Sequence, residues 1–290
     1  MTERIIRIES ACSLSLRDEQ LVFSYPSGEE NTVPLEDLSL LLIDSREVSF
    51  TVPAMEAVTR YGGIAVMCDA SCSPSALVTP LHANVRQTLR YKQQTEVTEE
   101  ERDAIWDDVV TAKILTQAAA LDYLSIAGGD EIRRLAEGGG VAGREGIAAD
   151  IYWKRLFGKD FRRDRFGDGP NPFLNYGYAV LRAETVKALL CAGLHPSFGL
   201  HHTNRYDAYV LADDMMEPFR PFVDVEVYKL WAEGKRKTDK EAKERLVALL
   251  LSDIKSGRRT IQLRNAVSQM ASSLVKRIED EGQLALPSLC

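Results

Sequence analysis

Residues 38–44 read LSLLLID, an apolar run with the length of a β-strand. Upstream lies LVFSY (21–25), a second strand-like segment, and the chain between the two begins with the turn-forming sequence PSGEEN (26–31). Gly28 in this turn can adopt a positive φ angle. The arrangement predicts a β-hairpin that joins residues 21–25 to residues 38–44.

The strand pattern continues outward from these residues. EVSFTV (47–52) and GIAVMC (63–68) are further strand candidates. Between them, PAMEAVTRYGG (53–63) fits a short helix, with a proline in its first turn and two glycines at its end. The start of the chain is therefore predicted to be β-rich.

Strand-like patterning stops at SPSALVTP (73–80), whose prolines and small residues are typical of a connector. We therefore predict an α+β fold with a small N-terminal β-rich domain at residues 1–76. A linker and first helix follow at residues 77–94, and a larger all-α catalytic domain covers residues 95–290.

Helix signals support the second domain. Thr98 with Glu101, and Thr238 with Glu241, both have the S/T-x-x-E spacing of a capping box. In the last helical segment, apolar residues recur at three- and four-residue steps and predict one buried stripe. The stripe consists of Leu263, Val267, Met270, Leu274 and Ile278.

Composition narrows the classes of function. A net charge of −7 argues against a uniformly basic nucleic-acid binder, although basic residues gather between Arg144 and Arg165. The sequence has no signal-peptide pattern and no apolar stretch of about 18 residues, so we expect a cytoplasmic protein without membrane contact. Five cysteines without a CxxC pair argue against a disulfide framework.

The segment GLHHTNRYDAYVLADDMMEPFRP (199–221) concentrates metal-ligating side chains, with His201 and His202 followed by Asp214 and Glu217. The two carboxylates are three residues apart, so on a helix they lie on one face and can approach one ion. The alternative is a D-x-x-E helix start with Pro218 in the first turn, which has no chemical role.

Glu145 begins a stripe that continues into Ala149, Tyr152 and Leu156 at helical spacing. A carboxylate on an inward-facing stripe needs a partner, because an unpaired buried charge is costly. A metal ion or an arginine would serve, and the remaining alternative is an ordinary surface glutamate.

Three segments of the second domain together resemble one known family. They are REGIAADIYWKRLFG (144–158), NPFLNYGYAVLRAETVKALLCAGLHPSFGLHH (171–202) and LADDMMEPFRPFVD (211–224). In this order and spacing they resemble the CRISPR-associated endonuclease and integrase family of the spacer-acquisition machinery, and its type II variant most closely. The β-rich start and helical remainder also fit that family, so the resemblance covers most of the chain.

The resemblance implies a metal site. Its E-G-x-A-A motif makes Glu145 a ligand, its G-x-x-H motif makes His202 a ligand, and its acidic motif before F-R-P makes Glu217 the third, with Asp214 beside it. This chain has glutamate at 217 where the family commonly has aspartate, which leaves open whether Asp214 touches the metal. The implied ion is Mg²⁺ or Mn²⁺, which suits carboxylate-rich ligation.

The adjacent histidines are expected to differ in orientation. Neighbouring side chains of an extended segment point to opposite faces, so one histidine would face the carboxylates and the other would not. The resemblance selects His202 as the ligand. His201 is then predicted to form hydrogen bonds or to lie near DNA.

The resemblance also implies the reaction. The 3′-hydroxyl of a captured DNA fragment attacks a phosphodiester at the CRISPR repeat boundary, and water in its place gives nuclease activity. Basic side chains that follow Glu145 are assigned to DNA phosphates, the alternative being a solvated surface. They are Lys154, Arg155, Lys159, Arg162, Arg163 and Arg165.

The implied partners are double-stranded DNA, in the form of the spacer fragment and the CRISPR repeat, and other proteins. The resemblance implies a homodimer joined mainly through the β-rich domain. A small second CRISPR-associated protein would bridge dimers into an integration complex, and the type II effector nuclease is a further possible partner. Two other functions stay open, a stand-alone metal-dependent phosphoesterase on other nucleic acids and a non-catalytic helical scaffold.

Overall fold

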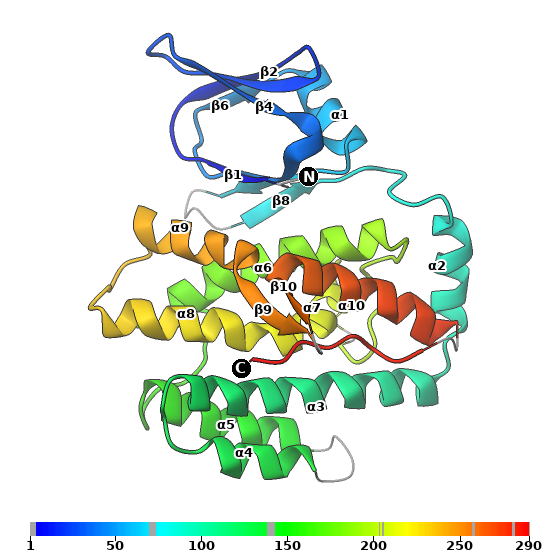
Figure 1. The fold of residues 1–290 in the computed structure, drawn as a ribbon, viewed down its shortest axis with the longest axis vertical. Coiled ribbons are helices and arrows are strands. Elements are labelled where there is room, and N and C mark those ends of the chain that lie inside the picture. The colour runs from blue at the N-terminus through cyan, green and yellow to red at the C-terminus, as the bar shows by residue number, and fades with distance from the viewer. Residues whose placement is uncertain are drawn as a thin grey trace. The chain divides into compact units, whose positions relative to one another are not determined.

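The structure is a computed structural model of the chain. It describes residues 4–69, 74–137, 143–202, 204, 206–256, 259–279 and 282–289. The chain forms two compact units, Met1–Val85 and Arg86–Cys290 (Figure 1). Within these described ranges, no helix is long and apolar enough to cross a membrane.

The N-terminal unit contains two four-stranded sheets. The first has the order β1 (Arg4–Ile8), β5 (Leu38–Ile43), β7 (Ile64–Cys68) and β8 (Pro74–Val78). The second has the order β4 (Glu30–Pro34), β3 (Gln20–Ser24), β2 (Cys12–Arg17) and β6 (Val48–Phe50). The short helices of this unit are η1 (Leu35–Asp37) and α1 (Val52–Arg60).

Strand β5 is an inner strand of the first sheet and is buried along its whole length. It pairs in parallel with β1 on one side and with β7 on the other. A strand covered on both faces is apolar without alternation, which explains the continuous run in LSLLLI.

The predicted hairpin between residues 21–25 and 38–44 is wrong. Strand β3 instead turns back at Tyr25–Glu29 and pairs antiparallel with β4, with Phe23 opposite Asn31. Gly28 has a φ angle of +85° in this turn, as its sequence context indicated. Strand β4 is mostly exposed and polar, so it carries no apolar pattern from which a sequence could identify it.

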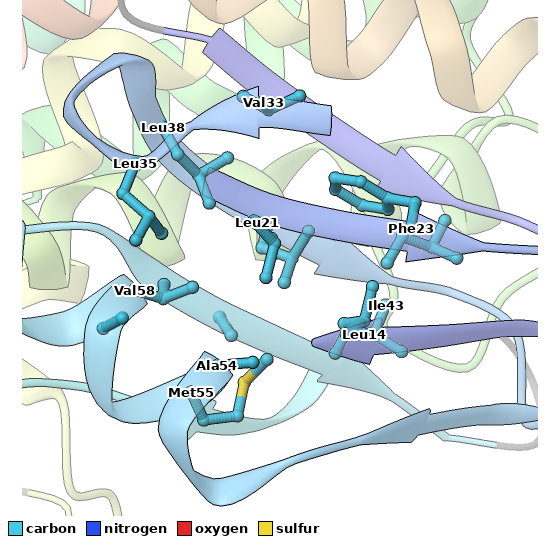
Figure 2. Close-up of a cluster of buried hydrophobic side chains, with 14 of the residues drawn as sticks. Leu14, Leu21, Phe23, Val33, Leu35, Leu38, Ile43, Ala54, Met55 and Val58 are labelled. Atoms are coloured by element: carbon cyan, nitrogen blue, oxygen red, sulfur yellow. The ribbon is translucent and has the colours of Figure 1, made fainter. Parts of the chain in front are cut away.

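The core of the N-terminal unit collects side chains from both sheets and from α1. In Figure 2, Leu14, Leu21 and Phe23 of the second sheet lie in one cluster with Met55 and Val58 of α1. The predicted helix is confirmed, since α1 starts beside Pro53 and the chain leaves it through Gly62 at a φ angle of +82°.

The predicted connector at residues 73–80 is also wrong in part. This segment contains strand β8, which pairs antiparallel with β7. Pro74 is its first residue, a place where the missing N–H of proline is tolerated. The N-terminal unit therefore extends beyond residue 76, the predicted domain end, and closes at Val85.

The second unit is mainly helical but not all-α as predicted. Two four-residue strands, β9 (Asp253–Ser256) and β10 (Arg259–Gln262), form an antiparallel pair within it. Strands this short carry too few residues for a recognisable alternation. The helices are α2 (Gln87–Glu96), α3 (Glu99–Tyr123), α4 (Gly129–Ala136), α5 (Arg144–Phe157), α6 (Asn171–Cys191), α7 (Val210–Met216), η2 (Glu217–Phe219), α8 (Arg220–Ala232), α9 (Lys240–Ala248), η3 (Leu249–Leu251) and α10 (Leu263–Ile278).

The helix signals are confirmed in two of three cases. Thr98 and Glu101 form a complete capping box at the start of α3. The apolar stripe of α10 is buried except at Ile278, which is half-buried. Thr238 does not cap α9, because Asp239 takes that position and its carboxylate accepts a hydrogen bond from the backbone N–H of Ala242 at 3.0 Å.

Helix α6 is a central element of the helical unit and contacts α7, α8, α9 and α10 (Figure 1). At Gly177, helix α6 packs closely against α8 and α9. A Cβ atom on this residue would overlap Val223 Cγ1 of α8 and lie 3.3 Å from Leu246 Cδ2 of α9. The absence of a side chain at 177 therefore sets how tightly three helices pack.

We predict that Gly177→Ala destabilises the protein although alanine favours helix formation. Overpacking of this kind lowers the free energy of unfolding by about 1–3 kcal/mol, whereas the higher helix propensity of alanine raises it by about 1 kcal/mol. Gly146→Ala in α5 is the matched control, because nothing lies within 4 Å of its added Cβ. Urea unfolding of both variants tests this, and a Gly177→Ala protein as stable as Gly146→Ala would contradict it.

Candidate metal centre

Glu145 and Glu217, far apart in the sequence, converge on one buried ammonium group. Lys113 Nζ lies 2.6 Å from Glu145 Oε1 and 2.6 Å from Glu217 Oε2. Helix α3 supplies Lys113, the first turn of α5 supplies Glu145, and η2 supplies Glu217. Two of the side chains predicted from the sequence are thus brought together.

Arg144 fixes where α5 begins. Its guanidinium donates to Asp107 Oδ1 at 2.6 Å and to Thr111 Oγ1 at 2.8 Å, both on α3. Helices α3, α4 and α5 pack together in the helical unit (Figure 1). This contact places the neighbouring Glu145 beside α3, within reach of Lys113.

Glu217 is buried between two cations, Lys113 on Oε2 and Arg220 on Oε1 at 3.1 Å. Burial raises the pKa of Glu217, but the charges of Arg220 and Lys113 outweigh burial and lower the pKa overall. Burial likewise lowers the pKa of Lys113, and the charges of Glu217 and Glu145 raise it overall. Glu217 and Lys113 are therefore both charged at neutral pH.

One oxygen of Glu217 has an incomplete set of partners. Oε2 is buried and has no hydrogen bond within the described part of the chain. Lys113 Nζ lies 2.6 Å from this oxygen as its ion-pair partner.

Asp214 anchors the loop that carries the histidines. Its fully buried carboxylate accepts hydrogen bonds from the backbone N–H groups of Leu200, His201 and His202 at 2.7, 3.1 and 3.3 Å. His202 Nδ1 forms a further hydrogen bond with Asp214 Oδ1. The sequence left open direct contact of Asp214 with a metal, and in the structure both of its oxygens are engaged by this loop.

Gly199 makes this loop possible. A Cβ atom at position 199 would lie 2.7 Å from the backbone oxygen of His202 and 3.3 Å from Asp214 Oδ2. A backbone atom cannot give way as a flexible side chain can. The glycine of the G-x-x-H motif is therefore required for the loop to close on Asp214.

The two histidines do not point to opposite faces as predicted. The His201 ring stacks on the Trp106 indole at 4.6 Å between centroids, and the His202 ring meets the same indole edge-on at 5.7 Å. The prediction assumed an extended strand, whereas the loop curves around the Asp214 carboxylate.

The hydrogen bond with Asp214 is the main cause of a raised pKa for His202, and burial opposes it. The charge of Glu217 acts in the same direction as Asp214. With Nδ1 engaged, Nε2 is the nitrogen that can bind a cation.

The donor set fits a divalent cation. Two carboxylates and one imidazole suit Mg²⁺ or Mn²⁺, and Glu217 has a buried oxygen without a hydrogen bond. Within the ranges that the structure describes, however, no three histidine, cysteine or acidic side chains are arranged to hold an ion. Lys113 stands between the two glutamates.

The predicted DNA-binding residues fall into two groups. Lys154 pairs with Asp150, Arg155 pairs with Glu131, and the Arg163 guanidinium is held within the protein. Lys159, Arg162 and Arg165 are exposed and form no ion pair with any described residue. The second group is the more available for phosphate contacts.

Arg163 is a structural residue in this arrangement. It donates to Asn171 Oδ1 at 3.1 Å and Asn175 Oδ1 at 2.7 Å, and it lies 5.2 Å from the centre of the Tyr178 ring. Arg220 lies 4.9 Å from the same ring. The sequence assigned Arg163 to DNA because it follows Glu145 closely together with other basic residues.

Asp224 is a buried carboxylate that follows Glu217 in the sequence, and its hydrogen bonds connect helices of this unit. Asp224 accepts hydrogen bonds from the Tyr152 hydroxyl at 3.0 Å and from the Tyr178 hydroxyl. Tyr152 and Asp224 follow Glu145 and Glu217 by about two helical turns each. This contact therefore joins α5 to α8.

Sequence reasoning missed Lys113, Arg220, Trp106 and Asp224. A detectable signal existed for Lys113, since it is the only charged residue in the run VVTAKILTQAAAL (109–121). A lone lysine on an apolar helix implies a buried partner. No local pattern identifies the others.

We predict that Asp224 makes stability fall as pH rises. Burial raises the pKa of Asp224 from 3.8 to about 7, so the folded protein keeps a proton that the unfolded chain releases between these values. The free energy of unfolding of the wild type should decrease, relative to Asp224→Asn, between pH 5 and pH 8. Urea unfolding at both pH values measures this, and parallel pH dependences would rule it out.

Comparisons with known proteins place the chain in a family. The family model described as CRISPR associated protein Cas1 matches residues 6–262. The CRISPR-associated endonuclease Cas1 of Neisseria meningitidis serogroup C is 33% identical over all of this chain and 97% of that protein. A Cas1 protein of Francisella tularensis subsp. novicida is 27% identical over 88% of this chain and 86% of its own.

Solved structures share the fold. A casposase bound to integration product has a TM-score of 0.80 at 20% identity, covering 98% of this chain and 92% of that one. A Cas1 protein from Thermotoga maritima also has a TM-score of 0.80, at 16% identity, covering 97% of this chain and 99% of that one. The resemblance found in the sequence is confirmed, and the chain belongs to the Cas1 family of CRISPR-associated endonucleases.

Proposed function

We propose that this protein is a divalent-metal-dependent DNA endonuclease and integrase of a type II CRISPR system. It inserts captured foreign DNA fragments into the CRISPR array as new spacers by 3′-hydroxyl transesterification. The observation that supports this is the convergence of Glu145 and Glu217 on one cation, the Lys113 ammonium group.

Each group of the centre has a separate task in this proposal. Glu145, Glu217 and Nε2 of His202 would hold Mg²⁺ or Mn²⁺, which when bound activates hydroxyl and phosphoryl oxygens as a Lewis acid. Asp214 keeps the His202 imidazole in one orientation through Nδ1. Arg220 keeps Glu217 ionised and therefore able to ligate.

Substrate DNA is bound through its phosphates. Lys159, Arg162 and Arg165 are exposed and follow the helix that carries Glu145. Lys154 and Arg155 can join them, because exposed ion pairs are weak and exchange readily. The related fold of a casposase that was solved with an integration product supports DNA as the substrate.

The assembly proposed is a homodimer joined mainly through the N-terminal β-rich unit. A small second CRISPR-associated protein bridges such dimers, and the type II effector nuclease is a further partner. Two solved neighbours that are Cas6-RT-Cas1–Cas2 complexes, with TM-scores of 0.75 and 0.65, support the second protein as a partner. The proposed location is the cytoplasm, where the CRISPR array lies.

We predict that Glu145→Gln and His202→Ala each reduce strand transfer by more than about 100-fold and leave DNA affinity nearly unchanged. The ligands of one ion act as a unit, so the loss of one ligand removes most of the catalytic effect of the ion. A strand-transfer assay with a 3′-overhanging duplex, alongside fluorescence anisotropy for DNA affinity, measures both. Asp150→Asn, an exposed carboxylate on the same helix, is the control.

Other results of this experiment separate the competing functions. Retained strand transfer in Glu145→Gln would contradict the metal site. Cleavage of small phosphate esters without action on DNA ends would favour a phosphoesterase. A wild type that binds no Mn²⁺ and transfers no strands would favour a scaffold.

We predict that replacing Lys159, Arg162 and Arg165 together with alanine weakens DNA binding and lowers its salt dependence. Each lost phosphate contact reduces the slope of log affinity against log salt by about 0.9, so the expected change is about 2–3. Arg163→Ala should instead lower the free energy of unfolding and leave the slope unchanged, because its guanidinium bonds Asn171 and Asn175. An unchanged slope in the triple variant would exclude these residues as phosphate contacts.

A further inference from the structure

We propose that Lys113 is a resident counter-cation of the Glu145–Glu217 pair, which a divalent ion must displace on binding. Lys113 would therefore be a positioning residue that sets the metal affinity of the centre. This inference rests on the proposed metal-dependent function and concerns the same site.

The first argument is the depth and geometry of the ammonium group. The Lys113 side chain is only 13% exposed, and its Nζ lies 2.6 Å from one oxygen of each glutamate. A buried ammonium is stable only when it is paired. Lys113 thus holds together two carboxylates that would repel each other in its absence.

The second argument is the balance of charge. Glu145 and Glu217 are paired with two cations, Lys113 between the two glutamates and Arg220 on the other oxygen of Glu217. The cluster is therefore neutral without a metal. If a divalent ion entered this cluster while Lys113 remained between the carboxylates, the two cations would be adjacent. Repulsion between like charges is strong at a poorly hydrated site such as this one.

The third argument identifies which of the two cations can leave. Arg220 pairs with the other oxygen of Glu217 and lies 4.9 Å from the centre of the Tyr178 ring. Lys113 has a flexible four-carbon stem and a partner glutamate, Glu145, whose side chain is 30% exposed. Lys113 is therefore the cation that can swing away.

The arrangement has a consequence for the metal-free protein. The two carboxylates stay assembled before any ion arrives, because Lys113 bridges them. Metal binding then exchanges one cation for another and does not have to bring α3, α5 and η2 together.

The test measures Mn²⁺ affinity by calorimetry in the full chain. Lys113→Met removes the competing charge and keeps a similar length, so its dissociation constant should be at least about tenfold lower than that of the wild type. Lys240→Met is the control, because it removes the same charge from an exposed side chain on α9 and should leave affinity unchanged.

The outcomes separate this inference from the proposed function. A wild type that binds Mn²⁺, together with a Lys113→Met protein that binds it no more tightly, would overturn the inference and leave the metal site in place. A wild type that binds no Mn²⁺ would overturn both.

A second measurement uses the unmodified protein, in case Lys113→Met does not fold. Amine acylation followed by mass spectrometry reports how accessible each lysine is. Saturating Mg²⁺ should increase acylation of Lys113 several-fold and leave Lys240 unchanged. Acylation of Lys113 that stayed constant or decreased with Mg²⁺ would contradict displacement.

Discussion

The helical unit depends on one ionic contact, the bridge of Lys113 between Glu145 and Glu217. Charges buried at this depth are tolerated only if each meets an opposite charge at short range. That requirement fixes α3, α5 and η2 against one another, since each contributes one member of the bridge. The chemistry proposed for the protein and the packing of its helices therefore share the same residues.

Other buried polar groups extend this constraint. Asp214 uses both oxygens to shape the histidine loop, and Asp224 uses both oxygens to join Tyr152 of α5 with Tyr178 of α6. Fully satisfied buried networks of this kind specify one arrangement, because any alternative leaves a polar group unpaired. Gly177 and Gly199 allow the necessary close approach of backbone and side chains.

The sequence predicted those elements that follow a local rule. It did not predict strands that form only by pairing with a neighbouring strand. The helix at residues 53–63, the Thr98 capping box and the α10 stripe follow from spacing within one segment. Strand β4 is polar and exposed, β8 begins with proline, and β9 and β10 are four residues long. These strands exist because a neighbouring strand offers hydrogen bonds, which no local pattern encodes.

For the site, the sequence by itself pointed to Glu145, His202 and Glu217 as the proposed donors, through the family resemblance of the local motifs that contain them. Only the tertiary structure decided that Lys113 lies between the glutamates, that Asp214 turns to the loop and that Arg163 is held by Asn171 and Asn175. The physical reason is that charge pairing depends on which helices pack together. That packing is set by the whole core and not by the residues on either side of a charge.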